Sequence, residues 1–459
     1  MAVAAPMLTR AQDQSVHTAA WRLRAGLWLA LAGISLACFL NTLDDVRRYP
    51  GTDLRARVVG AREMMRGLDP YFIAAKTDQT DALQDPDRYA AVCSRCTYTP
   101  TLLCLYAPLA NLPYGVQRYI WFGAEWCALA GSILLLRGTM RDGLLKNVFT
   151  AVALLFFADG AFWRFHLERG QYYVFILFLF SLTARFCLGK STAQEEPSSA
   201  DRWWHGIPLG LAAAMRLTPL AALLPLWVLG LRRTAVGAAI VAIVCIAGSI
   251  RLSGFGLWQS YFRAVSIQSQ LTWNPDYLES ERAKLPPLPA NVEGMTFKRI
   301  LHLQDSNVTF ASDVLQPLAN CFGWAPGREH WLTVSQAGAV LICLLFPVLL
   351  RFRRALEPGE KLAAAFLCVL SAELFLPVRL SYCDVMLLAP IGLLMLRMFR
   401  NSAGYVCFAV VLMGLALTHS LLPDESSIPI LRPPLIMAGL LGYLVIGFGK
   451  GRGNTPNAR

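Results

Sequence analysis

The sequence predicts an all-α, polytopic membrane protein, and two observations carry this prediction. The 459 residues are 55% hydrophobic and only 16% charged, whereas an ordinary soluble domain carries about 25% charged residues. Apolar runs of roughly 20 residues recur from end to end, and each is long enough as a helix to cross the hydrocarbon core of a bilayer. The length of these runs argues against a large soluble core.

The net charge of +12 has a simple explanation in a membrane protein. Loops on the cytoplasmic side carry an excess of Lys and Arg, so a positive balance is expected without any polyanionic partner. The chain has no Lys/Arg-rich block with interleaved aromatic residues, which disfavours a nucleic-acid partner. Membrane lipids are the expected surroundings.

About twelve transmembrane helices are expected from the apolar runs. They lie near residues 22–41, 98–112, 118–136, 147–163, 171–188, 206–230, 234–250, 332–350, 361–376, 383–397, 403–420 and 435–449. In order along the chain, we expect a cytoplasmic N-terminus (1–21), the first transmembrane helix (22–41), an extracytoplasmic loop (42–97), transmembrane helices 2–7 (98–250), a second extracytoplasmic loop (251–331), transmembrane helices 8–12 (332–449) and a cytoplasmic tail (450–459).

Basic loops set the expected orientation. The segments 231–233, 351–354, 397–400 and 450–459 are rich in Arg or Lys and fall inside when both termini are cytoplasmic. The loop with Arg137, Arg141 and Lys146 falls outside in this count. Either this loop is a tolerated exception or one segment is re-entrant, and residues 98–112, which are short and contain two prolines, are the best candidate. The same count places His166, Glu168 and Arg169 inside as interfacial polar residues.

The first extracytoplasmic loop opens with an amphipathic helix. Leu54, Val58, Ala61 and Met65 fall on one helical face, which predicts a helix lying on the membrane surface. Gly67 ends this helix, and residues 69–71 form a turn. Two interpretations of Asp53 stay open. It could cap the helix, as Thr52 also could, or it could act as a general base close to the membrane.

Further motifs follow in a fixed order. They are Gly67 to Tyr71, Tyr98-Thr99-Pro100, Tyr106-Ala107-Pro108, Leu112-Pro113, Gly170-Gln171 and Arg216-Leu217-Thr218-Pro219. In this order they resemble the polyprenyl-phosphate-dependent membrane glycosyltransferases of family 87, within the C-type glycosyltransferase superfamily. The resemblance spans residues 45 to about 390 and implies the C-type architecture, with helical extracytoplasmic loops.

The resemblance implies an activity and its substrates. Members of the family transfer mannose, arabinofuranose or related sugars from a polyprenyl-phosphate donor to a lipid-linked or cell-envelope glycan acceptor, on the outer face of the plasma membrane. Asp53 matches the position of the family's catalytic base. The implied enzyme is an inverting hexosyl- or pentosyltransferase in which Asp53 removes the proton of the acceptor hydroxyl.

Substrate-binding residues are expected around Asp53. The leaving phosphate needs cations, for which Arg216, Arg379 and Arg299 are the candidates. Arg216 lies in an apolar stretch where a charge is usually functional, and Pro219 predicts a broken helix there; a structural ion pair is the alternative. Tyr71 and Gln171 enter the site through the family motifs. Relatives carry a Trp and a His pair late in the chain, and Tyr382 and Cys383 occupy the likely His positions here, so Tyr382 is included. This departure indicates either a different sugar or acceptor or a phosphate bound by Arg379, and Asp384 as a structural partner of Arg379 stays the alternative.

No cofactor and no metal are expected, because no His pair has metal-ligand spacing. Asp44, Asp45 and Asp53 could still approach one another and hold a divalent cation with the phosphate. Two other functions stay open: a transporter or flippase of a lipid-linked sugar, and a non-catalytic subunit of an envelope-assembly complex.

Overall fold

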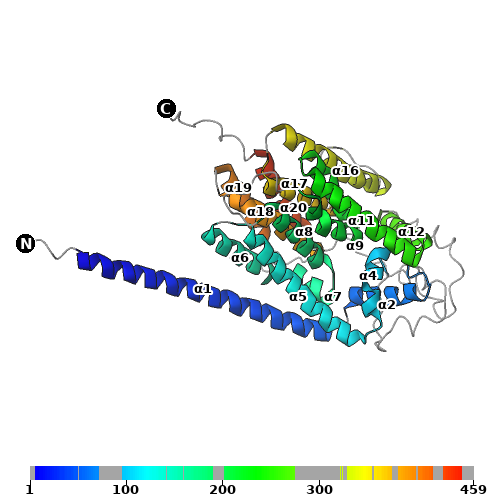
Figure 1. Cartoon of the computed structure of the whole chain (residues 1–459), viewed down its shortest axis with the longest axis horizontal. Coiled ribbons are helices and arrows are strands. Elements are labelled where there is room, and N and C mark those ends of the chain that lie inside the picture. Colours follow the sequence, from blue (N-terminus) through cyan, green and yellow to red (C-terminus); the bar gives the residue numbers. More distant parts are fainter. Residues whose placement is uncertain are drawn as a thin grey trace, which may run out of the picture.

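The computed structural model describes residues 6–49, 51–71, 96–140, 142–158, 160–189, 201–273, 321, 323, 328–353, 356–374, 381–399, 402–416 and 427–446. Every regular element within these ranges is a helix. The helices form an elongated bundle, and α1 (Pro6–Arg48) runs along one side of it with its N-terminal part projecting beyond the bundle (Figure 1).

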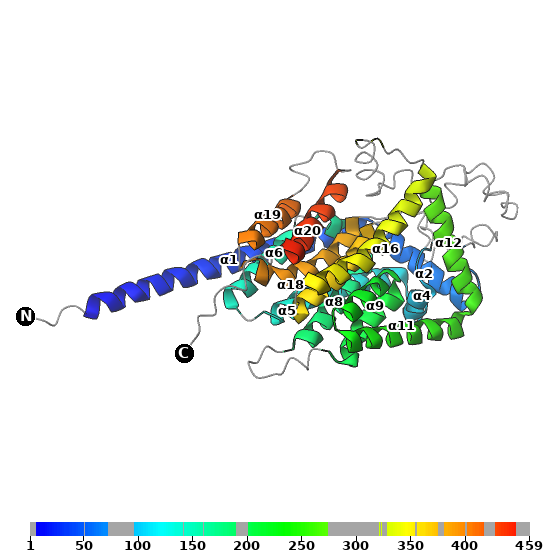
Figure 2. The same ribbon diagram turned by 90° about the horizontal axis from the view of Figure 1, so that it is seen from above.

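One end of the bundle gathers three helices, α2 (Thr52–Met65), α4 (Pro100–Ala110) and α12 (Phe255–Trp273) (Figures 1 and 2). The apolar face of α2 is buried against the protein: Leu54, Val58 and Ala61 pack with Tyr106 and Tyr114. The expectation that α2 lies on the membrane surface with its apolar face in lipid is therefore wrong, because α4 and the start of α5 cover that face.

Helices α5 (Tyr114–Gly138) and α8 (Tyr173–Leu188) run from this end to the opposite end of the bundle. Between them, α6 (Gly143–Ala158) and α7 (Ala161–Arg169) form a pair bent by 63°, a broken span or a re-entrant loop. The hydroxyl of Tyr114 donates to the carbonyl of Gly51 at 3.0 Å, which fixes the first residue of α5 beside the start of α2. At the other end, Arg137 Nη2 lies 3.4 Å from Asn147 Oδ1.

The segment 206–230 is broken into α9 (Ile207–Met215), the 3₁₀ helix η4 (Thr218–Ala222) and α10 (Leu223–Val228). The break lies at Arg216, whose backbone is extended (φ −149°, ψ 135°), as Pro219 predicts. Gly206 packs on the first turn of α11 (Arg232–Ser253), where a Cβ would collide with the carbonyl of Thr234. Since Leu231 directly precedes α11, the segment begins and ends at the same end of the bundle.

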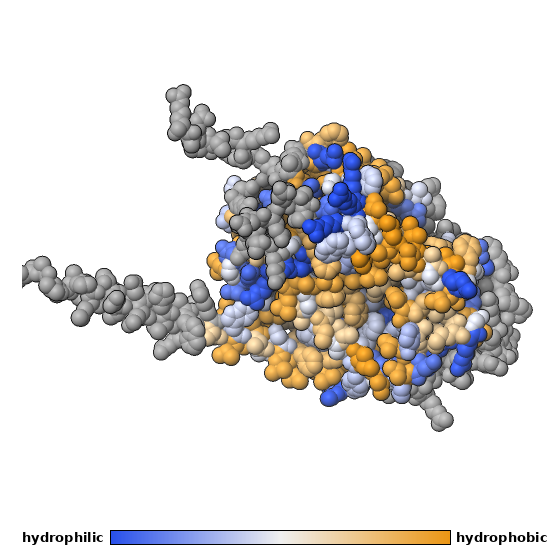
Figure 3. Space-filling model, viewed as in Figure 1, coloured by the Kyte–Doolittle hydropathy of each residue, from blue (hydrophilic) through white to orange (hydrophobic). Residues whose placement is uncertain are grey.

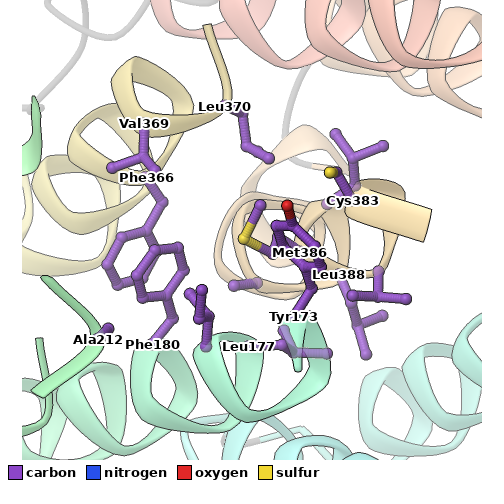
Figure 4. Packing of buried hydrophobic residues seen from close by; sticks show 14 of the residues in the cluster. Tyr173, Leu177, Phe180, Ala212, Phe366, Val369, Leu370, Cys383, Met386 and Leu388 are labelled. Carbon is purple, nitrogen blue, oxygen red and sulfur yellow. The ribbon is translucent and has the colours of Figure 1, made fainter. Parts of the chain in front are cut away.

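The remaining described helices complete the bundle. They are η3 (Trp203–Gly206), α16 (Arg328–Arg353), α17 (Pro358–Leu374), η7 (Ser381–Leu387), α18 (Leu388–Met398), α19 (Ser402–Ala416) and α20 (Ser427–Ile446). Their core packs closely onto α8, where Phe180 and Phe366 stack in parallel with centroids 4.4 Å apart (Figure 4). In lipid such contacts stabilise the bundle by packing, because the surrounding chains are as apolar as the side chains.

Three helices in the described part are long and apolar enough to cross a membrane: Ala25–Arg48, Tyr114–Gly138 and Arg232–Ser253. The bent pair α6–α7 makes a fourth if it counts as one span. Hydrophobic residues dominate the visible face of the molecule (Figure 3). The expected all-helical membrane fold is thus confirmed in its coarse form, but twelve crossings are not. Helix α4, with 11 residues, is about 16 Å long, half of what a crossing needs.

Candidate active site

Asp53 lies in the first turn of α2, and its side chain does not cap the helix. The N-cap residue is Gly51, in the left-handed conformation (φ 67°), and no side chain makes a capping hydrogen bond. The expected capping by Thr52 or Asp53 is therefore wrong. Instead, Oδ2 of Asp53 accepts a hydrogen bond from Gln171 Nε2 at 2.5 Å and another from Arg169 Nη1 at 3.2 Å.

The turn after α7 delivers both of these partners. Gly170 ends α7 in the left-handed conformation (φ 69°), and the amide of Gln171 reaches back to the carbonyl of His166 at 3.0 Å. This glycine-terminated helix end points the flanking residues, Arg169 and Gln171, toward the same carboxylate. Trp121 fixes Gln171 further by donating from Nε1 to its backbone carbonyl at 3.1 Å.

Two tyrosines tie the first loop to Asp53. The hydroxyl of Tyr98 donates to the backbone carbonyl of Asp53 at 2.7 Å, and the hydroxyl of Tyr71 donates to the carbonyl of Tyr98 at 2.6 Å. The Tyr71 amide donates to Asp69 Oδ1 at 3.0 Å, which closes the predicted turn. Tyr71 thus supports the site through Tyr98 and does not contact the carboxylate of Asp53.

The electrostatics of Asp53 reflect opposing effects. Burial raises the pKa of Asp53, because a poorly hydrated carboxylate resists ionisation. The charge and hydrogen bond of Arg169 act in the opposite direction, followed by the charge of Arg57 and the hydrogen bond of Gln171. The Asp53 side chain keeps 12% of its surface exposed. Both hydrogen bonds go to Oδ2, and within the described part of the chain Oδ1 accepts none, which leaves it for a hydroxyl group.

Arg216 is held by a buried acid. Its Nε and Nη2 contact the two carboxylate oxygens of Glu373 at 2.5 and 2.7 Å, and Thr218 also donates to Glu373. The same guanidinium donates to the hydroxyl of Tyr172 at 3.2 Å. Sequence reasoning missed Glu373. Its signal was an acid within an apolar run, where an ionisable residue needs a partner.

Tyr98 and Tyr172 connect the Asp53 and Arg216 groups. Their rings lie 5.7 Å apart, and the hydroxyl of Thr99 contacts the carbonyls of Ala214 and Met215 at 3.2 and 3.0 Å, beside Arg216. The start of α4 therefore joins the Asp53 end of the site to the broken helix.

The other expected site residues differ in what the structure describes. Tyr382 is buried, with its ring 5.3 Å from that of Tyr173 and 5.7 Å from that of Phe165. Arg379 and Arg299 lie outside the described residues. Of the residues expected around Asp53, Gln171 contacts it directly. Tyr71 and Tyr382 are connected to it through other aromatic residues.

Arg169 corrects the expected orientation. The twelve-helix count predicts that Arg169 lies on the cytoplasmic side, away from the chemistry, yet it contacts the carboxylate of Asp53. The count of crossings treats residues 98–112 as a full crossing. Helix α4 begins at Pro100, directly after Thr99 beside Arg216, and ends near α2, where Arg62 donates to the carbonyls of Ala110 and Leu112 at 2.7 and 3.2 Å. One crossing fewer puts Arg169 and Asp53 on the same side.

The three aspartates considered for a cation do not gather. Asp45 makes a two-point contact with Arg164 at 2.6 and 2.7 Å, and Asp44 pairs with Arg48 at 2.7 Å. Among the described residues, no group of three or more His, Cys, Asp or Glu side chains has the arrangement of a metal site.

Most of the residues around Asp53 lie in a segment that matches a family model. Residues 97–283 match glycosyltransferase family 87. The match covers about two fifths of the chain and includes Tyr98, Arg169, Gln171 and Arg216. It confirms the resemblance expected from the motifs and indicates a membrane glycosyltransferase, with donor and acceptor substrates. No curated protein and no solved structure matches the chain.

Proposed function

We propose that this protein transfers a hexose or pentofuranose from a polyprenyl-phosphate donor to a lipid-linked or cell-envelope glycan, with Asp53 as the general base. The observation that carries the proposal is the position of Asp53. Its carboxylate contacts Arg169 and Gln171, which belong to the segment matched by family 87, and one carboxylate oxygen has no hydrogen bond within the described chain.

The proposed reaction is a single inverting displacement. The acceptor hydroxyl oxygen attacks the anomeric carbon while Asp53 takes its proton, and the bond from the anomeric carbon to the phosphate oxygen breaks. The bonding pair leaves with polyprenyl phosphate, so negative charge grows on the phosphate. Inversion follows because the nucleophile and the leaving group occupy opposite faces of the sugar. No metal or cofactor takes part in the proposal.

The distribution of charge supports an active site on the extracytoplasmic face of the plasma membrane. Arg232 and Arg233 are exposed at the end of the bundle opposite Asp53, and Arg351 donates to the carbonyl of Val228 at 2.6 Å at that end. Arg137 lies there too, at the end of α5. Since basic residues favour the cytoplasmic side, these positions support an outward-facing Asp53.

A reconstitution experiment tests the function. Full-length protein in liposomes is given a radiolabelled polyprenyl-phosphate sugar and a crude envelope acceptor, and both the label in acceptor and the label on each leaflet are measured. We expect a new glycosidic product with the wild type and at least about 100-fold slower formation with Asp53→Asn. Movement of intact donor across the bilayer without product would mean a flippase, and neither activity would mean an assembly subunit.

A further inference from the structure

The ion pair between Arg169 and Asp53 is loose and partly open to solvent. It is a single contact of 3.2 Å, and the two side chains keep 17% and 12% of their surface exposed. A charge-assisted hydrogen bond is usually about 2.7–2.9 Å long, and a well-seated Arg–carboxylate pair is bidentate. The Arg169 guanidinium also lies 4.6 Å above the ring of Phe165, one turn back on α7. This stacking leaves the side chain supported if its contact with Asp53 breaks.

Two other arginines near the site, Arg216 and Arg57, already interact with neighbouring side chains. Arg216 makes two short contacts with Glu373, so its charge is matched. Arg57 is fully buried, with its guanidinium within 6 Å of four aromatic rings, those of Tyr98, Tyr106, Trp121 and Tyr172. Neither can turn to a phosphate without leaving a buried charge or breaking an aromatic cage.

We propose that Arg169 binds the phosphate of the donor lipid, and that it leaves Asp53 to do so. This inference rests on the proposed function and names the residue that holds the leaving group. In the substrate-free protein Arg169 neutralises Asp53. When the donor binds, the guanidinium of Arg169 pairs with the phosphate instead of with Asp53. The carboxylate of Asp53 therefore becomes a stronger base only once a sugar is present to be transferred.

The exchange has a physical consequence for Asp53. Arg169 is the largest of the effects that oppose the rise in the pKa of Asp53. Once its charge is matched by a phosphate, burial acts with less opposition, so the carboxylate holds a proton more tightly. Donor binding thus prepares the base without any movement of α2.

Binding of the leaving lipid tests the assignment without requiring catalysis. Full-length protein in nanodiscs is titrated with a short-chain polyprenyl phosphate and, separately, with the uncharged polyprenol. We expect Arg169→Gln to weaken polyprenyl-phosphate binding roughly tenfold or more, as loss of a charge-assisted contact predicts, and to leave polyprenol binding unchanged. Arg169→Lys should restore part of the loss. Arg164→Gln, on the same helix and paired with Asp45, is the matched control and should bind like the wild type.

A double-mutant cycle tests the exchange itself. Asp53→Asn releases Arg169 and should tighten polyprenyl-phosphate binding, whereas in the Arg169→Gln background the same change should do much less. Equal effects of Asp53→Asn in both backgrounds would mean simple charge repulsion and would overturn the exchange. Normal phosphate binding by a folded Arg169→Gln protein would overturn the assignment.

The outcome separates this inference from the proposed function. Arg169-dependent binding of polyprenyl phosphate without any sugar transfer would contradict the proposed glycosyltransferase activity and support the phosphate site. Sugar transfer that depends on Asp53 but not on Arg169 would support the glycosyltransferase activity and contradict the assignment of Arg169 to the phosphate. Competition by inorganic phosphate at the same concentrations would show a site for small anions and contradict a lipid donor.

Discussion

Arg57 lies one turn after Asp53 on α2 and is fully buried. Its Nη2 donates to the carbonyl of Gly170 at 3.3 Å, and the ring of Trp121 lies 4.4 Å from its guanidinium. Aromatic faces attract a desolvated cation by about 2 kcal/mol or more, which explains how a charge is accommodated here. Through the Gly170 carbonyl, Arg57 positions the turn that carries Arg169 and Gln171.

Removing the charge of Arg57 should change the pH dependence of transfer. The charge of Arg57 lowers the pKa of Asp53, so Arg57→Met should raise that pKa, and activity should be lost at a higher pH than in the wild type as the medium is acidified. Arg57→Lys keeps the charge and should keep the acid limb near its original position, even if the rate falls. The measurement is the rate of transfer against pH; identical acid limbs for wild type and Arg57→Met would contradict this.

At the residue scale, the sequence motifs single out Gln171, which contacts Asp53, but give no sign that Arg169 is its other partner. The motif resemblance also singles out Asp53, which lies outside the matched residues 97–283, so its role as a base stays a prediction. A count of crossings from hydropathy alone separates Arg169 from Asp53, whereas the two side chains are in contact. In the twelve-helix count, the basic loop at residues 137–146 falls on the outer side, against the positive-inside rule. Treating 98–112 as re-entrant resolves this disagreement and moves Arg169 to the side of Asp53. Glu373 needed a contact in three dimensions to be linked with Arg216.

Among the elements, the glycine-ended turn after α7 matters most to the site. A Cβ on Gly170 would lie 2.7 Å from Leu54 Cβ and 2.9 Å from Arg118 Nη1. Gly67, which follows α2, has a similar backbone (φ 73°) but nothing within 4 Å of such a Cβ. A residue with a Cβ would therefore meet the same backbone strain at either position, but its Cβ would be crowded only at Gly170.

Alanine at these two glycines should have unequal effects. Gly67→Ala should destabilise the protein by about 1–2 kcal/mol, the strain of a left-handed residue with a Cβ, and leave transfer nearly intact. Gly170→Ala should destabilise it more and reduce transfer at least about tenfold, equivalent to 1.4 kcal/mol in the barrier, because the turn must move away from α2. Thermal unfolding and transfer rates measure both. Equal losses at both positions would show that crowding against α2 is unimportant.

The broken helix at Arg216 illustrates what local sequence predicts at this scale. Pro219 predicts a break in the helix, and the structure has one. That the segment then returns to its starting end depends on Gly206 and Gly210, where a Cβ would crowd the backbone of α11. Small residues allow helices to approach closely in a membrane, but hydropathy averaged over a window does not distinguish such a return from a crossing.

For the whole molecule, the end of the bundle opposite Asp53 exposes arginines, although exposed arginines such as Arg66 also lie at the Asp53 end. Asp53, Arg169 and Gln171 lie at one end, and the exposed Arg232 and Arg233 at the other. The loop with Arg137 joins the basic end because α5 starts beside Gly51 and runs away from it. Because α4 has only 11 residues and is too short to cross, leaving it out of the count removes the exception to the positive-inside rule that twelve crossings create.

Chemical labelling should reveal this sidedness in intact cells. In a cysteine-depleted protein, Arg66→Cys places an exposed thiol at the end with Asp53, and Arg233→Cys places one at the basic end. A membrane-impermeant maleimide should label Arg66→Cys from outside and Arg233→Cys only after the membrane is opened. The reverse pattern would put Asp53 in the cytoplasm and contradict the proposed extracytoplasmic reaction.

The central claim is that Asp53 acts as the base of sugar transfer, and single-turnover transfer measured against pH tests it most directly. Wild-type activity should fall as the pH drops through the raised pKa of Asp53, because only the carboxylate form accepts a proton. A folded Asp53→Asn protein should be slower by about 10²–10⁴-fold, the usual contribution of a general base, and should lose this acid limb. An Asp53→Asn protein that keeps most of its activity and the same acid limb would contradict the claim.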